Sequence, residues 1–173
     1  MSVTRLVVHD PAWAEVYARE AKALKAMFGA ALTDIDHIGS TAIPGILAKP
    51  VIDILGSAND LSKIDARNAE MLALGYEPKG EHGLAGRRYF RKADARGRRR
   101  VHLHIYRKGD AALHRHLVFR DFLIAHPDKA KAYSELKREL TQTLGLSGQA
   151  YQSAKQDWID RTLQAALDWA ARQ

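Results

Sequence analysis

The stretch that decides the fold is HIGSTAIPGILAKPVIDIL, which spans residues 37–55. Residues 32–38 interleave apolar and polar types, which we interpret as a half-buried strand. Residues 51–55 form a short apolar run that is interrupted by one carboxylate, Asp53. Between the two runs lies a turn of small and hydroxylated residues, Gly39-Ser40-Thr41. The pattern therefore predicts a strand, a tight turn and a second strand.

The chemistry of this turn is suited to an anion. Gly39 has no Cβ atom and lets the backbone approach a ligand closely, and successive N–H groups in such a turn can form an anion-binding nest. Ser40 and Thr41 add hydroxyl groups, and Lys49 adds a positive charge nearby. We therefore expect Gly39, Ser40, Thr41 and Lys49 to bind phosphate. Asp53 is costly to bury in a strand unless it has a partner, a metal ion or an open cleft.

Composition narrows the class of protein. The 173 residues, 46% of them hydrophobic and 27% charged, predict a single domain over residues 1–173 with a sizeable core. The chain has no cysteine, which excludes disulfides and thiolate metal sites. The N-terminus lacks the apolar segment of a signal peptide, so we expect a cytoplasmic protein. The net charge of +7 favours anionic partners such as nucleotides, phosphorylated metabolites or RNA.

The remaining segments predict an α+β fold. Apolar periodicity and capping residues define the other elements. We expect strands over residues 5–9, 87–93 and 98–106, and helices over residues 11–28, 60–75, 110–126, 128–145 and from 147 onwards. The simplest architecture is a mixed β-sheet with flanking helices and a C-terminal helical layer.

The predicted hairpin over residues 87–106 carries the second informative pattern. Strand alternation places His102 and His104 on one face and the apolar residues between them on the other. Two such histidines can converge on a metal ion or on an anionic ligand, and the adjacent arginines favour the anion. Arg87 and Arg88, at the base of the hairpin, can contact phosphate oxygens. The arginines of the tip, residues 96–99, are expected to form a solvated face.

Several motifs occur in an order that resembles the GrpB family, a branch of the nucleotidyltransferase superfamily that is sometimes fused to dephospho-CoA kinase. Besides the stretch over residues 37–55, these motifs are GRRYF at 86–90, HLHI at 102–105, FRDFL at 119–123 and Tyr151-x-x-x-Lys155. The resemblance covers nearly the whole chain and implies a nucleotidyltransferase-like fold.

The resemblance also implies a reaction and its residues. Enzymes of the superfamily transfer a nucleotidyl group to an acceptor with the help of divalent metal ions held by carboxylates. Asp53 would then be the catalytic carboxylate and would bind Mg²⁺ or Mn²⁺ together with His102 and His104. Ser40 would hold phosphate, and Tyr151 and Lys155, which lie four residues apart on one helix face, would also contact the ligand.

This chain departs from the superfamily at two positions. The usual second carboxylate of the pair is replaced by Leu55, and the later strand supplies histidines in place of an acid. Three functions therefore remain open. The first is nucleotidyl transfer to a small acceptor, and the second is binding of a nucleotide or CoA-like ligand without catalysis. The third is RNA binding through the arginines of the hairpin, which its few aromatic residues disfavour.

The pH dependence of binding distinguishes a metal from a phosphate at Asp53, His102 and His104. A metal ion needs neutral histidines, so its affinity should fall as the pH drops through the histidine range near ~6.5. A phosphate bound directly should gain affinity over the same interval.

Overall fold

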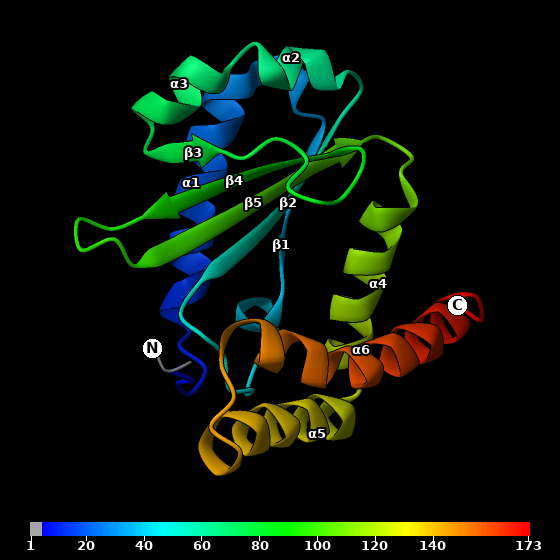
Figure 1. Ribbon diagram of the computed structural model, residues 1–173. Coiled ribbons are helices and arrows are strands. Elements are labelled where there is room, and N and C mark those ends of the chain that lie inside the picture. The colour runs from blue at the N-terminus through cyan, green and yellow to red at the C-terminus, as the bar shows by residue number, and fades with distance from the viewer. Residues whose placement is uncertain (1–4) are drawn as a thin grey trace.

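A computed structural model describes residues 5–173 and is built around one five-stranded sheet. The strand order is β1-β2-β5-β4-β3 (Figure 1). The strands are β1 Asp34–Ile38, β2 Ile52–Ala58, β3 Tyr76–Pro78, β4 Arg87–Ala93 and β5 Arg99–Arg107. Only β2 and β5 pair in parallel, while the other neighbours are antiparallel. The predicted α+β class with a mixed sheet is confirmed.

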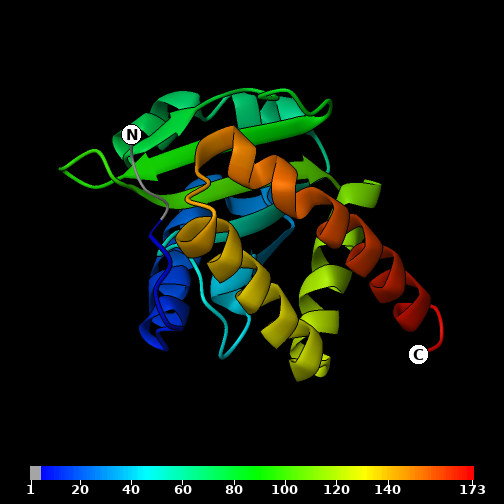
Figure 2. The same ribbon diagram turned by 60° about the horizontal axis from the view of Figure 1, so that its bottom comes forward.

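The helices divide between one face of the sheet and a C-terminal layer. They are α1 Ala12–Phe28, α2 Leu61–Asp65, α3 Asn68–Ala73, α4 Ala111–Ala125, α5 Pro127–Arg138 and α6 Gly148–Ala170. Short 3₁₀ segments η1 Gly29–Ala31 and η2 Ser40–Ala42, and a π-helical turn η3 Glu139–Thr143, complete the secondary structure. Helix α1 lies against one sheet face, whereas α5 and α6 form a platform below the sheet (Figures 1 and 2).

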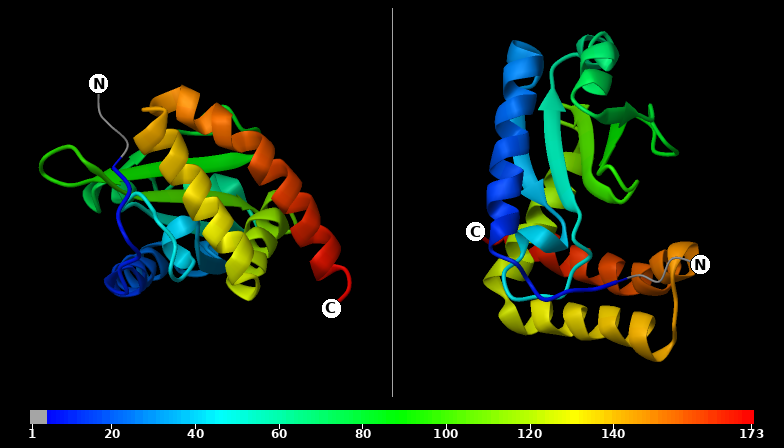
Figure 3. Two further views of the ribbon diagram at one scale, coloured as in Figure 1. Left: turned by 90° about the horizontal axis from the view of Figure 1, so that it is seen from below. Right: turned by 90° about the vertical axis from the view of Figure 1, so that its left-hand side faces the viewer.

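The core lies between α1 and the sheet. In α1, Leu24 and Phe28 follow the helical period, and both side chains are buried. They belong to one apolar cluster with Ile54 of β2 and Leu103 of β5, whose side chains point to this face. The opposite face of β2 and β5 therefore carries the polar residues of these strands. The side view in Figure 3 shows that face above the platform of α5 and α6.

Three predictions of local structure are wrong, and one short strand was missed. Residues 5–9 form no strand, because Val7 makes only an isolated bridge to Ala48. The helix predicted over 60–75 is broken into α2 and α3, since Arg67 leaves the helical conformation with φ −102° and ψ 13°. Helix α5 begins at Pro127 rather than after a cap at Asp128, because proline is pre-organised for the first helical position. The three-residue strand β3 was not predicted, and its proline is tolerated because β3 lies at the sheet edge.

Within residues 5–173, no helix combines the length and the apolar character that crossing a bilayer would need.

Candidate functional site

Asp53, His102 and His104 meet on the polar face of the sheet. The parallel register places Asp53 opposite His102 and Leu55 opposite His104. The Nδ1 atom of His102 lies 3.3 Å from Oδ1 of Asp53, and Nε2 of His104 lies 3.8 Å from the same oxygen. The predicted convergence of these three side chains is confirmed. Alternation along two neighbouring strands produces it, because every second side chain points to the same face.

The histidines keep Asp53 ionised. Burial raises the pKa of Asp53, but hydrogen bonds from His102 and His104 outweigh burial, so the pKa lies well below its ordinary value. The carboxylate is therefore hydrogen-bonded rather than isolated. Asp53 can be accommodated in an apolar strand because it has two partners, His102 and His104.

The same geometry is a poor fit to a ready-made metal centre. A metal ion would have to replace the contacts of both histidines with Oδ1 of Asp53, since those nitrogens face the oxygen itself. Over residues 5–173, no group of three or more histidine, cysteine or carboxylate side chains is arranged to hold a metal ion. A Mg²⁺ or Mn²⁺ ion on Asp53, His102 and His104 stays a prediction.

Strand β4 adds an aromatic ring and one arginine to this face. The ring of Tyr89 packs against both histidines, with centroids 5.7 Å from that of His102 and 5.1 Å from that of His104. The guanidinium of Arg87 lies 4.9 Å from the centroid of the Tyr89 ring and 3.5 Å from Nδ1 of His104. Arg87 also donates hydrogen bonds to the backbone carbonyls of Glu81 and His82, so the loop before β4 fixes its position.

Arg88 does not join Arg87 at this face. Its side chain points to the other side of β4 and makes two hydrogen bonds, 2.6 and 2.9 Å long, to the carboxylate of Asp65 in α2. The prediction that Arg87 and Arg88 serve one cleft overlooked strand alternation, which separates neighbouring side chains.

The turn after β1 touches the carboxylate directly. Gly39 has φ +73°, and a Cβ atom added there would lie only 2.6 Å from Oδ2 of Asp53. Ser40, which follows, is partly exposed and accepts a hydrogen bond of 3.0 Å from Nζ of Lys137. Thr41 is buried, and its hydroxyl contacts Nε2 of His37 at 2.9 Å. The turn thus brings Ser40 to the site, whereas the side chain of Thr41 points into the protein.

Two lysines from different elements flank one tyrosine of α6. The ring of Tyr151 is buried, and the Nζ atoms of Lys49 and Lys155 lie 4.9 and 4.7 Å from its centroid. Burial, together with the positive charge of Lys49, lowers the pKa of Lys155 to about 8, although Asp53 has the opposite effect. Burial and the charge of Arg99 lower the pKa of Lys49. Neither lysine forms an ion pair with any carboxylate of the described residues.

A family model described as GrpB protein matches residues 3–165 of the sequence. The chain belongs to the GrpB family. The resemblance inferred from the ordered motifs is thereby confirmed.

GrpB relatives cover nearly all of this chain. YqkA of Bacillus subtilis, a UPF0157 protein, is 41% identical over 164 residues, which are 95% of this chain but 47% of that protein. A dephospho-CoA kinase of Mycolicibacterium paratuberculosis is 33% identical in an alignment 190 residues long, gaps included. The alignment covers 96% of this chain and 46% of that protein. The chain therefore spans about half the length of these two relatives. The crystal structure of the conserved protein GrpB from Enterococcus faecalis has a TM-score of 0.90 at 36% identity, and the match covers 96% of this chain and 99% of that one.

Lys137 is one of three residues of this GrpB site that sequence reasoning missed. It lies four residues after Tyr133 on the buried stripe of α5, where the pattern predicts an apolar side chain, and only 2% of its surface is exposed. A charged residue on the apolar stripe of a predicted helix was the available signal. Tyr89 and His116 were also missed, and the ring of His116 in α4 lies 6.1 Å from that of His104.

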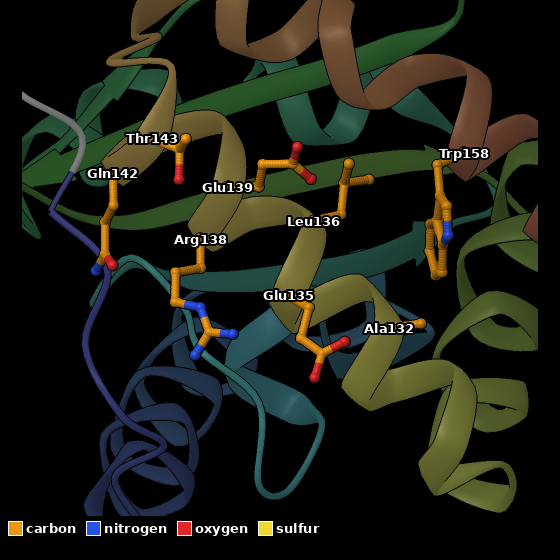
Figure 4. Close-up of a pocket in the computed structure, with 8 residues that line it drawn as sticks. All are labelled: Ala132, Glu135, Leu136, Arg138, Glu139, Gln142, Thr143 and Trp158. Atoms are coloured by element: carbon orange, nitrogen blue, oxygen red, sulfur yellow. The ribbon is translucent and has the colours of Figure 1, made fainter.

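Two surface pockets of the C-terminal layer do not contain the predicted site residues. One of about 530 Å³ lies along α5, η3 and the Trp158 side chain of α6 (Figure 4). Another, of about 470 Å³, lies between the loop after η2 and the helices α4 and α5. The candidate site on the polar sheet face therefore lies apart from both of these pockets.

Proposed function

We propose that this GrpB-family chain binds a phosphorylated small molecule, with nucleotides as the favoured class, on the polar sheet face. Its phosphate would lie between Ser40 of the turn and the amino groups of Lys49 and Lys155. The observation that carries this proposal is the placement of two lysines on one buried tyrosine ring without a carboxylate partner.

The physical argument concerns unbalanced charge. Two ammonium groups held near one ring repel each other, and partial burial removes water that would otherwise solvate them. A phosphate placed between them would relieve both costs. A hydrogen bond to a charged group contributes about 1.5–3 kcal/mol, so two such contacts are enough to select a phosphorylated ligand over its neutral analogue.

Asp53 indicates a second group that the ligand should have. A free carboxylate would repel phosphate, but Asp53 is already engaged by contacts with both histidines. We infer that Asp53 accepts a hydrogen bond from a hydroxyl of the ligand while the lysines bind its phosphate. A nucleotide carries both groups, on its ribose and its phosphate chain. The similarity to a protein named dephospho-CoA kinase also supports a nucleotide-related role for this chain.

The hairpin favours a small ligand over RNA. Asp94 accepts hydrogen bonds from the side chains of Arg98 and Arg100, so two cations of the hairpin are already paired. Arg99 is different, because it lies close enough to Lys49 to lower the pKa of that lysine. We therefore assign Arg99 to the edge of the phosphate site and the paired arginines to the structure of the hairpin.

Nucleotidyl transfer is the second candidate. The close approach of Gly39 to Asp53 favours it, since the turn and the carboxylate would then face the same ligand. Release of pyrophosphate from a labelled nucleoside triphosphate, measured without metal and with Mg²⁺ or Mn²⁺, tests this activity. Turnover that Asp53→Asn abolishes would establish transfer, whereas binding without turnover would establish a binding domain.

Calorimetric titration of the native chain with ATP, pyrophosphate, adenosine and CoA tests the binding proposal. We expect ATP and pyrophosphate to bind without added metal and adenosine to bind far more weakly. Equal binding of adenosine and ATP, or no binding of any phosphorylated compound, would contradict the proposal.

A further inference from the structure

Lys137 has a buried amino group that phosphate binding does not require. Its Nζ atom lies 3.0 Å from Oγ of Ser40 and also donates to the carbonyl oxygen of Leu47. The ring of Tyr133 lies beneath it, with the centroid 4.5 Å from Nζ. Over the described residues, Lys137 forms no ion pair. A buried amine without a counter-ion, in contact with a serine hydroxyl, is chemically distinct from the two lysines on Tyr151.

We propose that Ser40 and Lys137 form a serine–lysine dyad in which Ser40 is the nucleophile and Lys137 accepts its proton. The proposal deepens the proposed function, because the electrophile is the phosphorus atom of the bound phosphorylated ligand. Lysine can act as a general base where burial favours its neutral form, and a serine hydroxyl needs such a base to attack.

The hydrogen-bond geometry supplies each partner that the dyad needs. A neutral amine has one lone pair, which can accept the Ser40 hydroxyl proton, and N–H groups, one of which can donate to Leu47. Lys137 is buried, whereas Ser40 is only partly buried. In the proposed dyad, the incoming phosphorus atom approaches the part of Ser40 that is exposed.

The groups that surround Lys137 favour the neutral amine. Burial, together with the positive charge of Lys155 in α6, lowers the pKa of Lys137 to about 7. Tyr133 on its own helix is a neutral phenol, because burial raises the pKa of that hydroxyl. The contacts from the turn and the following loop are a hydroxyl and a carbonyl, and neither carries a charge. A fraction of the amine is thus ready to accept a proton near neutral pH.

The covalent step balances with the ligand class already named. A bond forms between Oγ of Ser40 and phosphorus, and the phosphorus–oxygen bond to the leaving group breaks. The leaving phosphate or pyrophosphate takes the electron pair, while the serine proton moves to Nζ of Lys137. The product is a phosphoserine-type or nucleotidyl-serine adduct at position 40.

An alkyl fluorophosphonate is a suitable probe of this dyad, because fluoride leaves when a serine oxygen attacks its phosphorus. We expect intact-mass and peptide analysis of the native chain to show one adduct, on Ser40. The labelling rate should rise as the pH increases through about 7, where a lysine of lowered pKa becomes a base. No adduct on Ser40, or a rate that does not change across this pH range, would overturn the dyad.

Variants separate a base from a structural clamp. Lys137→Met should lower the labelling rate about 100-fold or more, which is the scale of general-base catalysis. Lys137→Arg keeps hydrogen-bond donors but cannot accept a proton, so it should be equally slow. Recovery of the rate in Lys137→Arg would show a clamp only and would overturn the proposal. The matched controls are Lys129→Met, an exposed position on the same helix, and Ser153→Ala on α6.

Folding and ligand binding are measured alongside. Thermal unfolding shows whether each variant folds. If Lys137→Met does not fold, the pH profile of labelling in the native chain still tests the dyad. Pyrophosphate titration keeps the two proposals apart. Binding without labelling would contradict the dyad alone, whereas labelling of Ser40 without pyrophosphate binding would support the dyad and contradict the proposed function.

Discussion

A Cβ atom at Gly39 would lie 2.6 Å from Oδ2 of Asp53, closer than two such atoms can approach. The turn after β1 and the carboxylate of β2 are therefore fitted to each other. This contact explains why the chain has glycine at a position with φ +73° next to the candidate site.

Gly39→Ala should remove ligand binding and destabilise the protein. The matched control is Gly45→Ala, because Gly45 has φ +79° and its added Cβ atom would meet nothing within 4 Å. Both positions have a positive φ, which costs a non-glycine residue about 1–3 kcal/mol, but only Gly39→Ala also displaces Asp53. Urea unfolding and pyrophosphate titration measure the two effects. Equal losses of stability and unchanged affinity in both variants would show that the contact has no role.

Arg87→Gln and Arg88→Gln should have different effects although the residues are neighbours. Arg87 faces His104, so its loss should weaken ligand binding. Arg88 pairs with Asp65 on the opposite face, and removing a partly exposed pair costs about 0.2–1 kcal/mol of stability. The ligand affinity of Arg88→Gln should stay at the native value. A larger loss of affinity in Arg88→Gln than in Arg87→Gln would contradict this placement.

Ligand affinity should fall as the pH rises through about 8. The pKa of Lys155 is lowered by burial to about 8, so this lysine loses its positive charge above that pH and no longer attracts phosphate. Titration of pyrophosphate between about pH 6.5 and 9.5 measures the effect. A lysine with the ordinary pKa of ~10.4 would keep its charge over most of this range. Lys155→Met should bind weakly and lose most of this dependence. An affinity that stays constant or rises through pH 8 would contradict the role of Lys155.

Protein stability should rise with pH above neutrality because of Lys137. Its pKa is lowered to about 7 in the folded state, mainly by burial, so the unfolded chain binds more protons between this pKa and that of a free lysine. The free energy of unfolding should therefore increase by up to about 1.4 kcal/mol per pH unit from this group in that window, and this gain is lost as the pH falls to 7. Urea unfolding at several pH values measures the slope, and Lys137→Met should show a smaller one. Identical slopes would indicate that Lys137 is not deprotonated on folding.

The sequence could predict the centre of the site because strand alternation determines it. Asp53, His102 and His104 each lie in a run where apolar residues occupy the other face, so their common orientation follows from period two. The same rule should have separated Arg87 from Arg88. That error came from treating two basic neighbours as one patch rather than assigning each to a face.

Other parts of the site depend on contacts between distant segments. Lys137 reaches Ser40 across 97 positions of the chain, and Tyr89 packs against the histidines through the pairing of β4 with β5. No local pattern shows which buried lysine meets which turn, although a lysine on an apolar helix stripe marks a position to examine. The prediction of a strand over residues 5–9 was wrong because a strand also depends on pairing with distant segments. Val7 makes one isolated bridge, to Ala48.

Calorimetric titration of pyrophosphate into Lys49→Met and Lys155→Met, with Lys129→Met as the control, is the decisive test of the phosphate site. We expect each of the first two variants to lower the affinity at least about tenfold, which corresponds to about 1.4 kcal/mol, while the control keeps the native value. Native affinity in both Lys49→Met and Lys155→Met would contradict a phosphate site on the polar sheet face.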